Sequence, residues 1–175
     1  VNKKLQEFYR NSPGISSRID RIDEKNLKGG TSAYADLHGP TIKAANTRHV
    51  VPLLEDLADT YLTGATNMDH ILIHQLIKHA IEFKRVMDAS GTFFTEPELK
   101  QLAEATEGVG KYMQLLRAQA KENKHLIWHI TAKTHYMQHF PEEARLISSK
   151  VVQCYIEESY IGKIAEIWKL SLIHI

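Results

Sequence analysis

Histidines spaced four residues apart are the clearest candidates for chemistry in this chain. A His-rich stretch at residues 125–139 holds two such pairs, and a third pair lies upstream at residues 70 and 74. On a helix, residues i and i+4 face the same way, which is the spacing that two ligands of one metal ion need. The candidate ligands in the His-rich stretch are His125, His129, His135 and His139.

Three explanations of the His-rich stretch stay open. The aromatic neighbours Trp128, Tyr136 and Phe140 suit the flank of a hydrophobic core, and the imidazoles could equally contact phosphate or a protein partner. A metal site is the third explanation, but the stretch has neither an HExxH glutamate nor a cysteine. Because two separate pairs need further folding before they converge, we expect no tight zinc site and assign no metal ligand.

Two adjacent carboxylates, Glu157 and Glu158, are the candidate catalytic residues. They open a helix that we expect over residues 156–168, directly after a short strand expected at residues 151–155. Acidic side chains in a first helical turn are favoured by the helix dipole, which would explain them without any chemistry. The functional alternative is that one of them ligates a catalytic Mg²⁺.

Basic residues gather in one region although the chain as a whole is nearly neutral. The formal net charge is +1, yet residues 111–150 carry seven Lys or Arg against three acids, whereas residues 82–110 carry three against six. A solvated helix face is the simplest explanation, and a patch that contacts nucleic-acid phosphates is the alternative. The predicted nucleic-acid-binding residues are Lys111, Arg117, Lys121, Lys124 and Lys133.

The composition places the chain among ordinary globular domains. Its 175 residues, of which 43% are hydrophobic, suffice for one core. A single cysteine and the lack of a long apolar run or signal peptide favour an intracellular protein without a membrane partner. Phosphate loops, nucleophile elbows and dinucleotide fingerprints are absent, so we expect this fragment alone not to be an enzyme.

Apolar periodicity predicts the elements that must position these residues. Three long helices are expected at 48–63, 68–89 and 96–122, packed antiparallel, with shorter helices around residues 124–147. The predicted fold is all-α, an irregular helical bundle with at most one short strand pair. We divide the chain into an irregular segment at 1–40, a helical domain at 41–169 and a non-native tail at 170–175. The segment 1–40 is expected to hold a turn at Asn11–Gly14 and a short helix marked by Ile15, Ile19 and Ile22.

Individual residues predict how the long helices begin and pack. Asn67 is the expected N-cap of the second helix, and Thr95 with Glu98 forms a capping box for the third. In the first, Pro52 requires either a start near Arg48 or a kink. The first helix is expected to bury Val50, Leu53, Leu54, Leu57, Ala58 and Tyr61.

A heptad seam runs along the third helix from Leu99 to Ala120, and it would serve packing within the bundle or, alternatively, a protein partner. Gly108 and Gly110 interrupt this helix and indicate a close crossing or a kink. Pro141 followed by two glutamates is expected to open a fresh helical turn.

Three blocks carry a resemblance to known families: RHVVPLL at Arg48 to Leu54, KTHYMQHF at Lys133 to Phe140, and VVQCYIEESYIGKI at Val151 to Ile164. In order and spacing they resemble an uncharacterised family abundant in dinoflagellate transcriptomes, over residues 41–168. The same order is similar to the C-terminal helical region of DDE transposases of the CACTA and Kyakuja-Dileera-Zisupton kinds.

The transposase resemblance implies a DNA-binding helical region in a nuclear protein, with Glu157 or Glu158 in the acidic block that binds Mg²⁺ in the full-length enzyme. The ribonuclease-H-like sheet and its two aspartates should precede this region, and no run of strands does so here. The chain begins at Val1 and not at Met, so we expect a longer protein upstream. The competing interpretation is a helical protein interaction module without catalytic activity.

Overall fold

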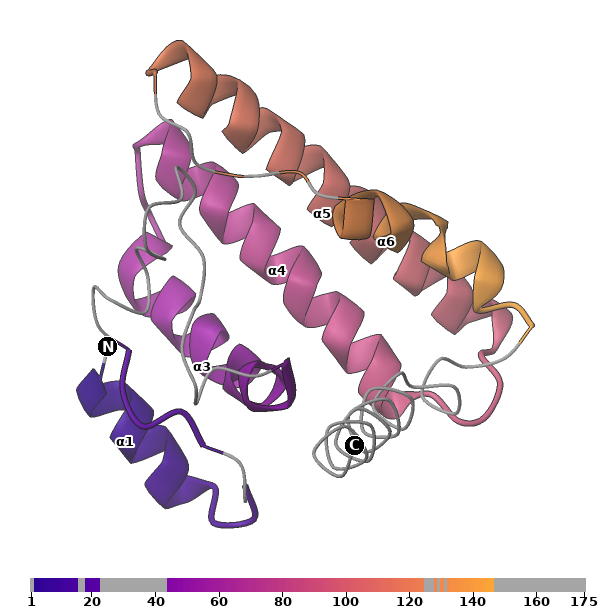
Figure 1. Ribbon diagram of the computed structural model, residues 1–175, viewed down its shortest axis with the longest axis horizontal. Helices are drawn as coiled ribbons and strands as arrows, with labels where there is room; N and C mark the ends of the chain where they lie inside the picture. The colour runs from indigo at the N-terminus through magenta and orange to yellow at the C-terminus, as the bar shows by residue number, and fades with distance from the viewer. Residues whose placement is uncertain are drawn as a thin grey trace, which may run out of the picture.

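The computed structural model describes residues 2–15, 18–22, 44–124, 128, 130 and 132–146. Side chains are described for all of these except residues 44–48 and 133. This part of the chain forms five helices and no strand: α1 (Asn2–Asn11), α3 (Ala44–Leu62), α4 (Met68–Ala89), α5 (Glu96–Glu122) and α6 (Ala132–Glu143) (Figure 1). The predicted all-α fold is confirmed.

The three long helices follow one another as antiparallel neighbours, as expected for helices joined by short loops (Figure 1). The most extensive contact is between α4 and α5, while α3 packs on the other side of α4, α6 on α5 and α1 on α3. The second and third helices have the predicted bounds. The first begins at Ala44, four residues before Arg48, and therefore contains Pro52 in its interior.

Side chains cap the starts of α4 and α5 as the sequence predicts. The Asn67 side-chain oxygen accepts a hydrogen bond of 2.8 Å from the Asp69 N–H. At α5 the Thr95 hydroxyl accepts from the Glu98 N–H at 3.5 Å, and the Glu98 carboxylate accepts from the Thr95 N–H at 2.7 Å. These bonds satisfy N–H groups that have no partner within the helix.

We expect Thr95→Ala to lower the free energy of unfolding by about 1 kcal/mol at neutral pH, the usual loss for an N-cap. The Thr95 N–H and hydroxyl both donate to the Glu98 carboxylate and hold its pKa below the ordinary value of 4.5. A depressed pKa adds stability that is present above the unfolded value and is lost as the pH falls through the folded pKa. The deficit of the variant should therefore shrink in acid.

Urea unfolding at about pH 7 and about pH 3 measures this deficit. Thr92→Ala, which changes an exposed loop residue three positions earlier, is the matched control and should have little effect at either pH. A deficit of Thr95→Ala that stays constant or grows toward acid would show that the Glu98 carboxylate contributes nothing through the capping box.

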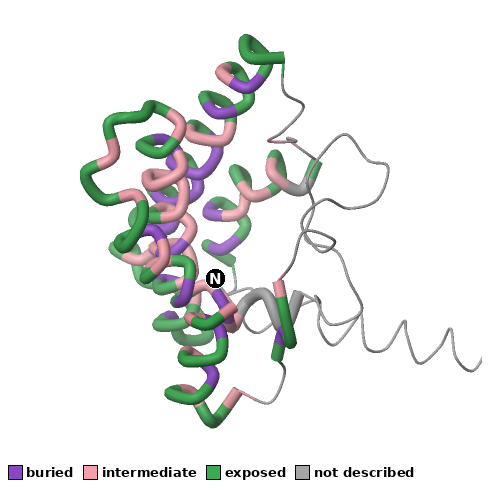
Figure 2. Tube along the Cα trace, turned by 90° about the vertical axis from the view of Figure 1, so that its left-hand side faces the viewer, coloured by how far each residue is buried: buried purple, intermediate pink, exposed green. Residues whose placement is uncertain are grey.

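The predicted heptad seam of α5 is the centre of the main core. Leu102 and Leu116 are 0% and 1% exposed, and the buried positions recur along the faces where helices meet (Figure 2). One cluster joins Leu102 to Val86 of α4 and to Ala144, just after α6. Because the seam contacts helices of its own chain, packing within the bundle accounts for it, which is the first of the two alternatives.

The N-terminal segment has its helix in a different place from the predicted one. The turn at Asn11–Gly14 is confirmed, but it ends α1, and residues 18–22 are not helical. Side chains of α1 form hydrogen bonds with backbone N–H and carbonyl groups of this segment, which a helix there would use for its own hydrogen bonds. The Asn2 amide bonds both the N–H and the carbonyl of Ile22 at 2.9 and 2.8 Å, and the Tyr9 hydroxyl accepts from the Ile19 N–H at 2.9 Å.

The apolar stripe predicted for α3 is only partly buried. Val50 and Leu53 pack with Leu5 and Tyr9 of α1 in a second core cluster. In contrast, Leu54 and Tyr61 are 42% and 65% exposed. The predicted burial of these two side chains is therefore wrong, although Val50 and Ala58, one turn before and after Leu54, are buried. Periodicity identifies the inward face of a helix, but not which of its side chains a neighbour covers.

Pro141 does not open a new helical turn, contrary to the prediction. It is the tenth residue of the 12-residue helix α6, and its side chain is buried. Only the last turn loses a backbone hydrogen bond there, which limits the cost of the proline.

In the described part of the chain no helix is long and apolar enough to cross a membrane. The strand expected at 151–155, the helix at 156–168 and the tail at 170–175 lie outside the described residues.

Candidate functional site

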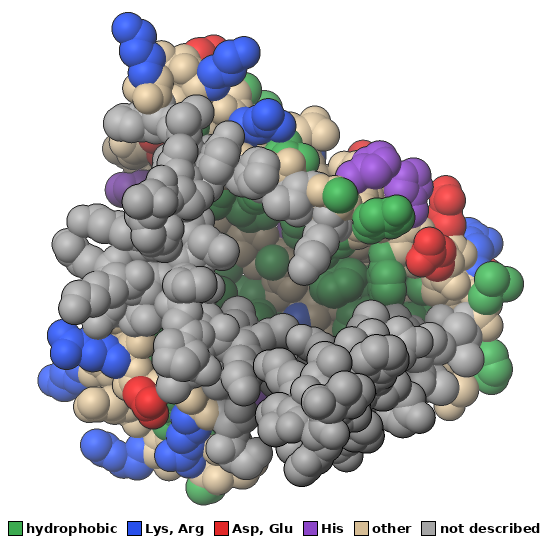
Figure 3. Space-filling view, viewed as in Figure 1, with side chains coloured by type: hydrophobic (Ala, Val, Ile, Leu, Met, Phe, Trp, Pro, Cys, Tyr) green, Lys and Arg blue, Asp and Glu red, His purple; other side chains and the backbone are tan. Residues whose placement is uncertain are grey.

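The C-terminal end of α5 carries the most coherent group among the predicted nucleic-acid-binding residues. Arg117, Lys121 and Lys124 are exposed. Arg117 and Lys121 are four residues apart and share one side of the helix, and Lys124 follows the C-cap Asn123. The backbone of Lys124 is left-handed (φ 57) and ends the helical path, but its N–H donates to the Lys121 carbonyl at 3.1 Å and keeps it next to the helix end. We call these three residues the basic end of α5, and Figure 3 shows Lys and Arg side chains grouped where this helix ends.

The charges at the basic end of α5 differ from those described cations that are paired with a carboxylate. Five other Lys and Arg residues have such a partner, for example Lys4 with Asp56 at 2.7 Å and Arg145 with Glu96 at 4.0 Å. No ion pair joins Arg117, Lys121 or Lys124 to another described residue. No ion pair with a described carboxylate therefore competes with an external anion for these three charges.

Of the other two predicted cations, Lys111 is not part of this group, and Lys133 is not described at the level of its side chain. Lys111 is exposed but turned to a different side of α5, one turn after Glu107 and with its ammonium 5.7 Å from the centre of the Tyr112 ring. Lys133 belongs to α6, and its side chain is outside the described part. Among the described side chains of the predicted five-residue surface, three lie together at the C-terminal end of α5.

A histidine pair on α6 is the second candidate. His135 and His139 are exposed, their Nε2 atoms are 3.3 Å apart, and their rings meet edge to face with centroids 4.8 Å apart. His125 and His129, the other predicted pair, lie outside the described residues. Among the residues described, no group of three or more His, Cys, Asp or Glu side chains converges as a metal site.

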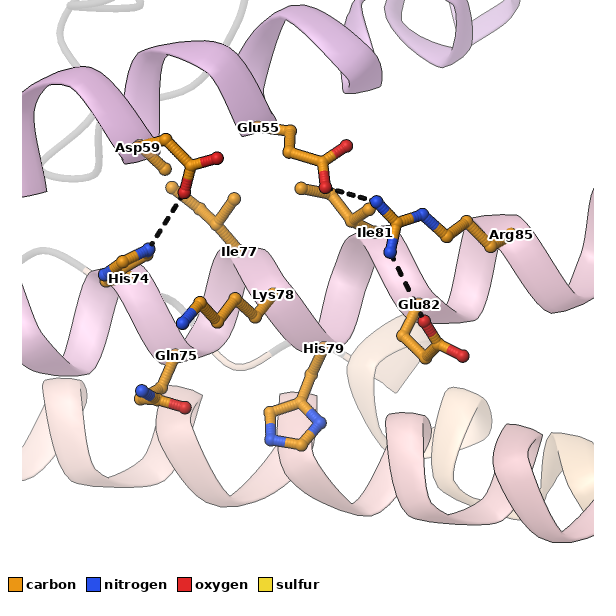
Figure 4. Close-up of a pocket in the computed structure, with 11 residues that line it drawn as sticks. Glu55, Asp59, His74, Gln75, Ile77, Lys78, His79, Ile81, Glu82 and Arg85 are labelled. Carbon is orange, nitrogen blue, oxygen red and sulfur yellow. Dashed lines mark hydrogen bonds and ion pairs between the residues drawn. The ribbon is translucent and has the colours of Figure 1, made fainter. Parts of the chain in front are cut away.

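A groove of about 490 Å³ between α3 and α4 is the third candidate. Charged side chains line it, but they pair across the groove (Figure 4). Arg85 of α4 contacts Glu55 of α3 and also lies 3.7 Å from Glu82. His74 points to Asp59 with Nε2 3.5 Å from the carboxylate, which is ion-pair range without hydrogen-bond geometry.

The pairing gives this groove a structural role in holding α3 against α4. The sequence did not reveal these contacts, because the spacings on the two helices do not correspond. Glu55 and Asp59 are four residues apart on α3, whereas His74 and Arg85 are 11 residues apart on the facing helix. His79, which also lines the groove, turns away from α3 toward α5 and stacks on Tyr112 with centroids 5.4 Å apart (Figure 4).

The acidic pair Glu157 and Glu158 lies outside the described residues, so its role as a Mg²⁺ ligand stays a prediction. The fold and these surfaces define an all-α domain with a basic helix end and an exposed histidine pair. No protein-family model, curated protein or solved structure matches this chain.

Proposed function

We propose that this domain binds duplex nucleic acid through phosphate contacts made by the basic end of α5, without reading base sequence. The observation that carries the proposal is the grouping of Arg117, Lys121 and Lys124 on one exposed helix end with no described acidic partner. Guanidinium and ammonium groups are the usual phosphate contacts in DNA-binding proteins. Three such groups form a small, sequence-independent contact.

The position at a helix C-terminus has two opposing effects. The helix dipole places about half a negative charge there, which stabilises nearby cations and would repel a phosphate. Three full positive charges exceed this partial charge together with the exposed carboxylate of Glu122, so the local potential stays positive. Lys121 in the last turn and Lys124 just beyond it thus interact favourably with the helix dipole and still attract an anion.

Duplex DNA is the polyanion that the transposase resemblance favours, and a nuclear location belongs to the same proposal. Any strand-transfer chemistry would require Glu157 or Glu158 with Mg²⁺ in a longer protein. Among the described residues no three His, Cys, Asp or Glu side chains converge on one metal position. We therefore propose that the domain holds DNA and does not cleave it alone.

The test is a fluorescence-anisotropy titration of duplex DNA at about 50 and 200 mM salt. Each neutralised phosphate contributes roughly −0.9 to the slope of log K against log salt, so three contacts predict a slope of about −2.7 and an affinity loss of about 40-fold over this range. The triple variant Arg117→Gln, Lys121→Gln, Lys124→Gln should bind more weakly and lose most of this slope.

A matched control removes the same number of charges elsewhere. Lys3, Arg10 and Lys100 are exposed on α1 and α5, away from the basic end, and their change to Gln should leave most of the affinity and slope intact. Equal losses in both triple variants would mean that net charge, and not this surface, governs binding. No binding at low salt would remove the proposal.

A protein partner is the second candidate function, and a different surface favours it. Tyr61, Met68 and Ile71 flank the junction of α3 and α4 and are 65%, 57% and 37% exposed. Exposed apolar side chains at one place are typical of protein contact surfaces. If the DNA titration is negative, this junction is the place to substitute, because the heptad seam is already buried within the chain.

A further inference from the structure

We propose that His135 and His139 form a two-ligand site for a divalent transition cation, such as Zn²⁺ or Ni²⁺, on the exposed face of α6. Imidazole nitrogen is a preferred ligand of both ions. The two residues are one helical turn apart, so the backbone of α6 fixes their relative position. This site is independent of the proposed nucleic-acid contact.

The distance between the ring nitrogens matches what one ion requires. A Zn–N bond measures about 2.0–2.1 Å, and two such bonds at a tetrahedral angle place the nitrogens about 3.3–3.4 Å apart. The observed Nε2 to Nε2 distance is 3.3 Å. A cation can therefore bridge the pair without any change in the helix, and it replaces one hydrogen bond between the rings by two coordination bonds.

The surroundings favour a cation at this place. Glu142 and Glu143 follow His139 by three and four residues, so their exposed carboxylates extend from the same side of α6. Figure 3 shows histidine side chains grouped on this helix with acidic side chains beside them. Arg145, the nearest described cation along the chain, lies 4.0 Å from Glu96 of α5.

The other described pair with the same spacing is arranged differently. His70 is exposed, but the His74 side chain is only 12% exposed and points to Asp59 of α3 (Figure 4). Spacing alone would predict a site in both helices, whereas the geometry assigns one only to α6. His70 and His74 thus provide an internal control with identical residue types and spacing.

A site with two protein ligands leaves the remaining positions of the ion to water. Structural zinc sites have four protein ligands, so binding at the α6 pair should be reversible and weaker. This proposal agrees with the expectation that the protein does not retain zinc through purification. The relevant measurement is a titration, and not the metal content of the purified protein.

The experiment is isothermal titration calorimetry of the full chain with Zn²⁺ and with Ni²⁺ in a buffer that does not chelate metals. Loss of even an outer partner of a metal ligand lowers affinity by about 10- to 100-fold, so loss of a ligand should cost at least about tenfold. We expect that loss for His135→Ala and for His139→Ala, and unchanged affinity for His70→Ala.

A second measurement shows that the effect concerns a folded protein. An ion that binds the folded state alone raises the melting temperature. Zn²⁺ should do so for the wild type and for His70→Ala, but much less for either α6 variant. His139→Gln repeats the test should alanine disturb the helix, and circular dichroism without metal confirms folding.

Three results would overturn the proposal. One is the absence of Zn²⁺ and Ni²⁺ binding by the wild type, and another is wild-type affinity in both α6 variants. The third is an equal loss in His70→Ala, which would indicate nonspecific binding. The variant His125→Ala, His129→Ala tests the neighbouring pair, and loss of binding there with normal binding in the α6 variants would place the site outside α6.

Discussion

We expect Leu102→Ala to lower the free energy of unfolding by about 2–5 kcal/mol, the usual range for a buried leucine. Leu102 is 0% exposed and lies where α4, α5 and the end of α6 meet. Its partners Val86, Leu99 and Ala144 come from all three helical regions, so they cannot collapse into the cavity without moving a helix. Incomplete collapse puts the loss toward the upper part of the range.

Leu115→Ala is the matched control on the same helix, because Leu115 is 43% exposed. It removes the same atoms from a site that water already reaches, and surface changes usually stay within about 0.5 kcal/mol. Chemical denaturation of both variants gives the comparison. Similar losses for Leu102→Ala and Leu115→Ala would mean that the α4–α5 contact is not the stabilising core of this domain.

Local signals in the sequence predicted the long helices well. The Thr95 and Glu98 capping box and the Asn67 cap depend on residues two or three positions apart, so no distant contact is needed to recognise them. The α5 seam is also local, since its apolar period appears in one helix. These features are therefore correct in their positions and in their burial.

The incorrect predictions all required knowledge of distant partners. Residues 18–22 have the apolar spacing of a helix, yet Asn2 and Tyr9 bond their backbone in a non-helical form. Pro141 by itself is typical of a helix start, but it lies within α6, at a place where this helix is next to α5. In both cases tertiary contacts override the local preference of the segment.

The candidate surfaces also differ in whether local spacing or distant contacts determine them. The spacing of Arg117 and Lys121 already places them together, because a single helix determines it. Lys124 lies beyond the helix and stays beside them through the bond of its N–H to the Lys121 carbonyl. Nothing in the sequence distinguishes the pair His135 and His139 from the pair His70 and His74. The difference arises because Asp59 of α3 draws His74 into a contact between helices, and that contact depends on the fold.

The two glycines in α5 give the second large prediction, because they meet different neighbours. A methyl group on Gly108 would overlap Cγ and Nδ1 of His79 in α4, and one on Gly110 would overlap the terminal amide of Gln138 in α6. The sequence-based expectation of a close helix crossing at these glycines is thus confirmed. Alanine itself favours a helix over glycine by about 1 kcal/mol. Whether each substitution stabilises or destabilises the domain therefore depends on whether the neighbouring side chain can move.

We expect Gly108→Ala to destabilise the domain and Gly110→Ala to leave it unchanged or more stable by up to about 1 kcal/mol. His79 Cγ is bonded to its own Cβ, so it can yield only by rotating the whole ring away from Tyr112 or by shifting α4. Overpacking of this kind costs about 1–3 kcal/mol and outweighs the gain in helix propensity. Gln138 is exposed, and its terminal amide can turn into solvent.

Urea unfolding of Gly108→Ala, His79→Ala and the double variant isolates the overlap, because contacting residues show a coupling energy in such a cycle. With the imidazole gone, Gly108→Ala should become neutral or stabilising, as Gly110→Ala is in the wild type. Equal destabilisation by Gly108→Ala in the His79→Ala protein and in the wild type would show that the overlap with His79 is not the cause. A change in the free energy of unfolding of the same sign for both glycine substitutions would also contradict the prediction, since the two neighbours differ in their freedom to move.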